Sequence, residues 1–358
     1  IRYIDTEALL KLFLPAAAAQ GSPMEMDLGS MASGVGPSLT VIKASRDYKE
    51  WEAVSAIDRD TLSPLLASIW GEPKQLTLAA ALPADADMAS AAALPLGEYI
   101  KTMLTLIDPA SKAQVDLALA QMEEATGLSL EKDILSWMGD EVAVVMAEAS
   151  AGSIIPIPSW GICMTASDPE GAAALFARLE DMVRAKIAEE FLATTQANAM
   201  QGAPLPQQMP EIFKDKRHGD ITSRVLAIPN APIAVEYALV GDVVALGWGP
   251  AIDDMLLALS GQAPRLSSTQ AWSDLAARVP GQAVNALSYM DFGALCRLGA
   301  IAISFMPEAP DAGVGRELLK ELPELLMILS ASTDWIVEAS YTEDDLTHAV
   351  GLAKLNLF

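Results

Sequence analysis

The stretch Gly127–Met146, GLSLEKDILSWMGDEVAVVM, predicts a short helix that leads directly into a buried strand. Ser129 is a preferred N-cap residue, and acidic residues follow it where the helix dipole favours negative charge. Gly139 suits the left-handed position that ends a helix. From residue 141 to 146 the chain becomes β-branched and apolar, which is typical of a strand buried on both faces. Trp137, beside the helix end, is expected to anchor the packing.

Helices and strands interleave along the rest of the chain without a regular βαβ rhythm, and most strands look joined as hairpins. Gly241 and Asp242 are expected to form the two-residue turn of one hairpin, with glycine at the position that needs a positive φ. This pattern favours an α+β fold with antiparallel sheets over a doubly wound parallel fold. Strands are expected over 39–45, 51–57, 75–82, 160–166, 221–228, 233–240, 243–248, 283–290, 332–341 and 346–355. Helices are expected over 61–70, 96–126, from Asp168 with Pro169 at its first position, over 250–260, from Ser268 as the cap, from Asp291 toward 305, and over 316–329. Residues 196–220 are expected to form a solvated polar loop.

Composition and charge exclude some classes of partner. The chain has 358 residues, of which 52% are hydrophobic, enough for about two domains with substantial cores. Its net charge is -24, from 23 basic and 47 acidic residues. Nucleic-acid binding needs a clustered basic face, and an anionic membrane surface also attracts basic segments. We therefore expect neither nucleic acid nor direct binding to an anionic membrane.

The cysteines and the apolar runs leave the compartment open. Cys163 and Cys296 could form one disulfide in an exported protein or remain two buried thiols, and their apolar surroundings favour buried thiols. The longest uncharged run, 149–167, contains two prolines and reads as a loop that leads into a strand. It is not a convincing membrane span.

Two parts of the chain resemble each other. Tyr3 and Asp5 correspond to Tyr289 and Asp291 at one separation, since 289 − 3 and 291 − 5 both equal 286. Downstream, 39–45 resembles 335–340. Self-similarity at a fixed period usually marks a repeated unit. We therefore expect 1–75 to be the closing part of a first unit and 76–358 a complete second unit, with the rest of the first unit encoded before Ile1. Each aspartate has an ordinary role as a helix cap.

Several motifs together resemble an uncharacterised bacterial family of exported proteins, a domain of unknown function. The motifs are Leu82–Asp85 (LPAD), Thr126–Leu130 with Asp133, Ser136–Glu141 (SWMGDE), Trp160–Asp168, Val240–Val243, Ser267–Trp272 and Tyr289–Asp291. The resemblance covers about 76–358. It implies an extracytoplasmic location, periplasmic or at the cell surface, with a signal or anchor ahead of this segment. It implies no activity, cofactor or catalytic residue.

The histidines do not suggest catalysis or zinc binding. His218 lies in the expected polar loop, and His348 alternates with apolar residues as on a sheet face. No Gly-x-Ser-x-Gly elbow and no zinc spacing is present in the sequence. The glycines of 247–249 precede a helix but lack the third glycine of a dinucleotide site, and Asp253 and Asp254 would repel a phosphate.

The carboxylate clusters are the remaining candidates for chemistry. They are Asp85/Asp87, Asp140/Glu141, Asp253/Asp254 and Glu343/Asp344/Asp345. Calcium favours such oxygens, but none of the clusters has the spacing of a twelve-residue calcium loop. Solvated turns and helix-start acids are the preferred explanation of these clusters. A glycosidase-type carboxylate pair stays open, because separations in space are invisible in a sequence.

Methionines suggest an adaptable apolar surface. Six of them could line a cavity or a partner surface: Met103, Met122, Met182, Met200, Met209 and Met255. Filling of irregular core gaps is the simpler interpretation.

These observations favour a non-catalytic binding or assembly module of the cell envelope, without a cofactor, a metal ion or catalytic residues. The alternative is a carrier or sensor of an apolar, lipid-like ligand held between sheet and helices. A hydrolase that uses acidic residues is the third hypothesis. Partners would be another protein, a second copy of the chain or the apolar ligand.

Overall fold

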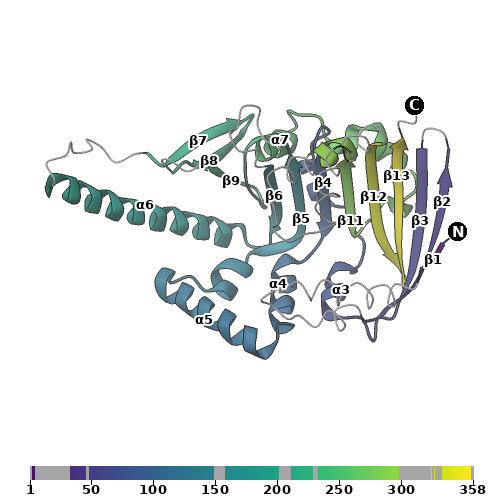
Figure 1. Ribbon diagram of the computed structural model, residues 1–358, viewed down its shortest axis with the longest axis horizontal. Coiled ribbons are helices and arrows are strands. Elements are labelled where there is room, and N and C mark those ends of the chain that lie inside the picture. Colours follow the sequence, from purple (N-terminus) through teal and green to yellow (C-terminus); the bar gives the residue numbers. More distant parts are fainter. Residues whose placement is uncertain are drawn as a thin grey trace.

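A single large sheet organises the protein. The computed structural model describes residues 2–4, 33–45, 48–148, 158–200, 211–228, 233–297, 324, 326 and 333–355. Their strands form one 13-stranded sheet in the order β1-β2-β3-β13-β12-β11-β4-β5-β6-β10-β9-β8-β7 (Figure 1). Every pair of neighbours is antiparallel. The α+β prediction is confirmed, with one continuous sheet in place of several.

The strands of this sheet are short to medium in length. They are β1 (Arg2–Ile4), β2 (Val35–Ala44), β3 (Tyr48–Ile57), β4 (Met88–Ala93), β5 (Met138–Ala147), β6 (Ser159–Ala166), β7 (Phe213–His218), β8 (Ile221–Leu226), β9 (Val235–Val240), β10 (Val243–Trp248), β11 (Ala286–Asp291), β12 (Thr333–Glu343) and β13 (Leu346–Leu355).

Helices connect and cover the strands. They are α3 (Pro64–Ile69), α4 (Leu96–Thr105), α5 (Pro109–Thr126), α6 (Pro169–Met200), α7 (Pro250–Leu259) and α8 (Gln270–Ala276), with the 3-10 turns η1 (Thr77–Ala81), η3 (Leu266–Ser268) and η4 (Pro280–Gln282) and the π-turn η2 (Leu130–Leu135). Helix α6 has 32 residues, which corresponds to about 48 Å, and its far end projects from the body (Figure 1).

The stretch that follows Gly127 folds differently from the prediction in three details. Ser129 makes no side-chain cap bond, and its N–H instead donates to Asp133 Oδ2 at 2.7 Å. The helix is a single π-turn, and β5 begins at Met138. Gly139 therefore lies inside the strand, where the Thr165 side chain and carbonyl come too close for a Cβ. Trp137 is 3% exposed and anchors the packing as expected.

Three further predictions are wrong. The strand expected over 75–82 is the 3-10 turn η1. The loop expected over 196–220 contains the end of α6 and all of β7. Helix α8 is capped by Thr269, whose Oγ1 accepts from Trp272 N at 3.3 Å, one residue after the expected cap. The helix expected from Asp5 lies outside the described residues. Of the helix expected over 316–329, only residues 324 and 326 are described, and both are helical.

Other capping and turn predictions are confirmed. Asp168 accepts from Gly171 N at 3.0 Å at the start of α6, and Asp291 accepts from Ala294 N at 2.8 Å. Gly241 has a φ of 61° in the turn between β9 and β10, a conformation that L side chains rarely adopt.

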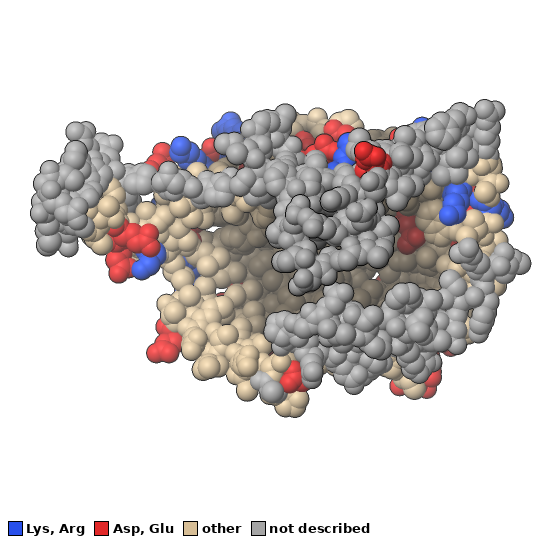
Figure 2. All heavy atoms as spheres, in the orientation of Figure 1, with Lys and Arg blue, Asp and Glu red and all other residues tan. Residues whose placement is uncertain are grey.

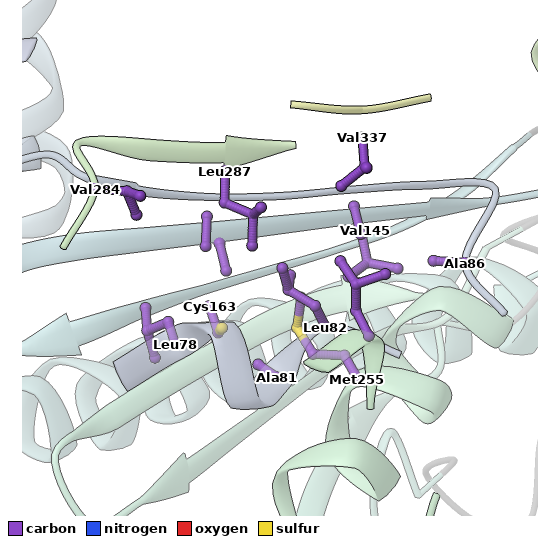
Figure 3. Close-up of a cluster of buried hydrophobic side chains, with 14 of the residues drawn as sticks. Leu78, Ala81, Leu82, Ala86, Val145, Cys163, Met255, Val284, Leu287 and Val337 are labelled. Atoms are coloured by element: carbon purple, nitrogen blue, oxygen red, sulfur yellow. The ribbon is translucent and has the colours of Figure 1, made fainter. Parts of the chain in front are cut away.

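One face of the sheet packs against α7, α8 and η1 to form the main core. Met255 and Leu256 of α7 are 0% exposed, and Figure 3 shows Met255 and Leu82 close to Val145 of the sheet. Two glycines bring α7 this close. A Cβ on Gly161 would lie 3.2 Å from Ile252 Cα, and one on Gly247 would collide with the Trp160 carbonyl oxygen.

The opposite face carries a smaller core near the start of α6. It joins Leu128 and Trp137 to Leu175 of α6 and to Met164 and Val244 of the sheet. Phe176 stacks on Tyr237 of β9 with centroids 4.6 Å apart. Among the described residues, this core covers the end of β6 near Ala166 and does not include Trp160 at its other end.

Gly247→Ala is expected to destabilise the fold by about 1–3 kcal/mol, because the added methyl group meets backbone atoms of β6. Gly71→Ala is the control, since nothing lies within 4 Å of its Cβ position. It is expected to change the free energy of unfolding by less than about 1 kcal/mol. Urea denaturation measures both, and equal midpoints for the two variants would contradict the close-approach argument.

Candidate functional site

A buried network of polar side chains lies where α7 crosses β7, β8 and β9. His218 Nε2 is 2.5 Å from Glu236 Oε1, and Ser223 Oγ donates to the same oxygen at 2.5 Å. Lys216 Nζ donates to Glu236 Oε2 at 3.1 Å and also to Asp253 Oδ1 of α7. His218, Ser223 and Glu236 are at most 4% exposed. Five side chains from four elements therefore meet in one network.

Local structure explains how these residues meet. Alternation along β7 places Lys216 and His218 on the same face, and register places Ser223 opposite Lys216. Gly249, with a φ of 69°, turns the chain from β10 into α7, so that Asp253 falls in the first turn of that helix. The prediction placed His218 in a solvated loop; it is instead the buried last residue of an ordered strand.

Hydrogen bonds in this network stabilise the charged forms of Glu236 and Lys216. Burial by itself would raise the pKa of Glu236, but hydrogen bonds from Ser223, Lys216 and His218 outweigh it and lower that pKa. Burial would lower the pKa of Lys216, but the bonds to Asp253 and Glu236 outweigh it and raise that pKa. A carboxylate held ionised next to an ammonium group is poorly suited to act as a general acid.

His218, Glu236 and Asp253 also offer three metal-ligand types, with their ligand atoms within 4.8 Å of one another. Lys216 argues against a metal ion here, because its ammonium group already forms an ion pair with each of the two carboxylates. A divalent cation would have to displace it. The residues therefore fit an internal brace that holds α7 to β7 and β9 better than they fit a metal centre.

Glu236→Gln is expected to lower the free energy of unfolding at pH 7 by about 1–3 kcal/mol, because the amide removes the charge that accepts from Ser223 and Lys216 in a buried position. The folded-state pKa of Glu236 is lowered, so its contribution is present above the unfolded value of about 4.3 and is lost as the pH falls through the folded value.

Urea denaturation at pH 7 and below pH 4 measures this effect. The difference in the free energy of unfolding between wild type and variant should be smaller below pH 4. Glu189→Gln is the control, since the Glu189 side chain is 72% exposed in its pair with Lys186. A gap that stays constant with pH would contradict a role for the Glu236 charge.

A second polar site lies beside the SWMGDE stretch. Glu141 is 4% exposed and accepts from Thr77 Oγ1 at 3.0 Å, from Leu78 N at 2.9 Å and from Lys74 Nζ at 3.0 Å. Asp140 also pairs with Lys74, at 2.7 Å. These bonds attach η1 to β5. A cleft of about 450 Å³ opens next to them, lined by hydroxyl and carboxylate groups together with Pro95, Met138 and Gly139.

The other carboxylate clusters separate into two groups. Glu343, Asp344 and Asp345 form the exposed turn between β12 and β13, where Arg59 donates to the Asp344 carbonyl. From the Asp85/Asp87 and Asp253/Asp254 pairs, Asp85 and Asp254 lie close enough to interact although they are distant in sequence. Burial raises the pKa of Asp254, and the charges of Asp85 and Asp253 raise it further.

We call the acids at one end of the sheet's strands the acidic rim: Asp85, Asp87, Glu148, Asp254, Asp291 and Asp334. Asp87 Oδ2 accepts from Glu148 N at 2.5 Å, and Asp87 O accepts from Asp291 N at 2.8 Å. Burial, together with the charges of Asp291 and Asp334, raises the pKa of Tyr289 to about 12. Arg297 pairs with Glu148, and Lys354 pairs with Asp334, so within the described part of the chain the rim has more acids than paired cations.

An apolar row crosses the sheet next to this rim, on the face opposite the main core. Register places one residue from each of six neighbouring strands in line: Trp248, Trp160, Met146, Met88, Met290 and Ile336. All six are half-buried. Trp160 and Trp248 meet edge to face with centroids 4.5 Å apart. We call this set the Met/Trp row.

The Met/Trp row was not identified from the sequence. Of the six methionines named there, Met255 lies in the main core, Met182 packs on the smaller core, and Met103 of α4 and Met122 of α5 are half-buried. Met209 and the Met200 side chain lie outside the described residues. Alternation could have assigned Met88, Met146 and Met290 to strand faces, but only the strand order aligns them.

Both cysteines are buried and unpaired, which agrees with the preference for two thiols. Burial raises the pKa of Cys163 to about 12 and raises that of Cys296 as well. Neither thiol is therefore expected to react with a thiol reagent at pH 8 in the folded protein, with labelling at least about 100-fold slower than after unfolding in urea. Rapid labelling of Cys163 in the native state would contradict its placement in the core.

The comparisons with known proteins add a partial family match. Residues 30–198, just under half of the chain, match a family described as "Protein of unknown function (DUF3352)". This span crosses the expected boundary at 75/76 and stops well short of 358, so it differs from the 76–358 of the sequence resemblance. No curated protein matches the chain.

A solved structure titled "Structure of crystal form III of TP0453" matches 78% of this chain and 79% of its own at 11% identity and a TM-score of 0.30. A likeness at this score does not define a shared fold. No helix within the described part of the chain is long and apolar enough to cross a membrane.

Proposed function

We propose that this chain is a non-catalytic binding module that takes an amphipathic, basic protein segment on its Met/Trp row. The observation that carries the proposal is the row itself, which is apolar over six strands and lies outside the main core. At a strand spacing of about 4.8 Å the row is roughly 24 Å long, which suits several turns of a helix or an extended peptide. Flexible methionine side chains adapt to apolar partners of different shapes.

The acidic rim supports the charge assigned to the partner. Each of four row residues has a rim acid within two positions in sequence, as with Met290 and Asp291 or Met88 and Asp87. A segment with an apolar side flanked by lysine or arginine would bury the apolar side on the row and pair its cations with the rim. Such electrostatic complementarity raises association rates and selects between partners.

The two buried polar sites support a non-catalytic role. Glu236 and Glu141 each accept three hydrogen bonds from groups within the protein, so neither carboxylate is presented to a substrate. Both tie one element of the fold to another. These two carboxylates therefore give no support to the hydrolase hypothesis.

The second candidate function is a carrier of an apolar ligand, and one feature of the molecular surface supports it. Figure 2 shows a central hollow in which the visible described side chains are mostly uncharged, with charged groups toward the periphery. Apolar ligands are usually enclosed in cavities of several hundred cubic ångströms. Two clefts among the described residues, of about 450 and 280 Å³, are instead lined by several charged groups, and the larger one also by hydroxyl groups, so a protein segment is the better candidate.

An extracytoplasmic location, at the cell envelope, is part of the same proposal. It is supported by the resemblance to exported proteins, and an alkaline phosphatase fusion to the complete reading frame tests it. The fusion should be active, because this reporter needs an oxidising compartment for its disulfides. Inactive fusions with normal expression would overturn this part of the proposal.

A calorimetric titration of the protein with a designed Leu/Lys amphipathic peptide tests the proposed partner. Met290→Asp is expected to weaken binding at least about tenfold, because it places a charge in the apolar row. Ser288→Asp is the matched control on the same strand and face, since Ser288 is already exposed, and it should change the affinity by less than about threefold.

Three results would decide against the proposal. If the two substitutions change the affinity equally, the Met/Trp row is not part of the binding surface. If a Leu/Glu peptide binds with the same affinity as the Leu/Lys peptide, the acidic rim does not contribute to binding. Binding of a fatty acid in place of either peptide would favour the carrier. Light scattering on the chain alone tells whether a second copy occupies the surface instead.

A further inference from the structure

Two hairpins of the sheet share the same dimensions at a constant separation in sequence. The hairpin of β2 and β3 runs from Val35 to Ile57, and that of β12 and β13 runs from Thr333 to Leu355. Both ends are displaced equally, because 333 − 35 and 355 − 57 both equal 298. The register irregularity between Val35 and Ser38 recurs between Thr333 and Ile336, at the same offset. Identical bulges at identical places are typical of related units.

The strands next to these hairpins also correspond. Tyr3 of β1 pairs with Leu39, and Tyr289 of β11 pairs with Val337. Leu39 and Val337 are related by the offset of the hairpins, since 337 − 39 equals 298, whereas the tyrosines give 289 − 3, which equals 286. The connection between β11 and β12 is therefore longer than the connection between β1 and β2, and the paired strands on either side of it still correspond.

A local twofold axis relates strands β1, β2 and β3 to strands β11, β12 and β13. Strands β3 and β13 pair antiparallel, and Glu52 lies opposite Val350, its own counterpart, since 350 − 52 again equals 298. Outward from this pair, β2 corresponds to β12 and β1 corresponds to β11. The contact between β3 and β13 thus has the self-complementary form of an interface between two copies of one unit.

The symmetry ends at β1. Strand β11 pairs on its other side with β4, from Ala286 opposite Ala92 to Met290 opposite Met88. Strand β1 has no neighbour on its other side among the described strands. The equivalent residues of β2 and β12 also differ in exposure: Leu39 is 46% exposed, whereas Val337 is 0% exposed.

We propose that the outer edge of β1 is an interaction surface for a strand equivalent to β4, carried by a preceding unit of the same polypeptide. The expected strand has the small, alternating side chains of Met88–Ala93, and it brings a covering layer that buries Leu39 as α8 and the main core bury Val337. The opposite edge of the sheet, β7, carries charged residues at 214–217, which protect an edge that stays free. This inference is independent of the proposed binding function.

Hydrogen exchange on the protein made from its complete reading frame tests the proposal. The amides of residues 2–4 are expected to exchange as slowly as those of β11, within about tenfold, and much more slowly than those of the free edge β7. In the 358-residue chain alone, the amides of β1 should exchange at least about tenfold faster than in the longer protein. Protection of β11 serves as the internal control for folding.

Leu39→Asp supplies a second measurement. The substitution should leave the urea midpoint of the 358-residue chain unchanged, because Leu39 is half-exposed there, and lower that of the longer protein by about 1 M. The proposal is overturned if the reading frame encodes no unit before Ile1, if β1 exchanges as rapidly as β7 in the longer protein, or if Leu39→Asp has the same effect in both proteins.

Discussion

The close contact between α7 and the sheet is the constraint on which the rest of the structure depends. Gly161 and Gly247 lack the Cβ atoms that would hold the helix away, so Ile252, Met255 and Leu256 reach the sheet and are completely buried. This contact determines which face of every strand is core. Because side chains alternate along a strand, it also determines which residues are turned to the opposite face, including the Met/Trp row.

The polar network at Glu236 follows from the same contact. Docking α7 on the sheet brings Asp253 to Lys216 and places His218 under the helix, where an unpaired polar group would be costly. Donors are supplied from β7 and β8, so that the Glu236 charge is compensated within the protein. A buried and satisfied network of this kind specifies one position of the helix, which is a structural role.

The two faces of the sheet therefore differ in character. The main-core face is filled with small and branched side chains at close to full burial, whereas the Met/Trp row remains half-buried beside a negatively charged rim. The proposed function depends on this difference. Helices α4 and α6 cover the other end of β5 and β6, which leaves the row at the end where the rim acids gather.

Much of the architecture was determined by local signals. Alternation identified most strands, Asp168 and Asp291 marked helix starts, and Gly241 marked a hairpin, because each depends only on neighbours in sequence. The same signals misassigned Thr77–Ala81 as a strand, since a short apolar run has no unambiguous period. His218 was misplaced because nothing in its own segment indicates burial. Only the tertiary structure decided the order of the strands, and with it the meeting of His218 with Glu236 and Asp253 and the alignment of Met88, Met146 and Met290. Pairing between strands far apart in sequence depends on how whole faces pack, and no local pattern contains that information.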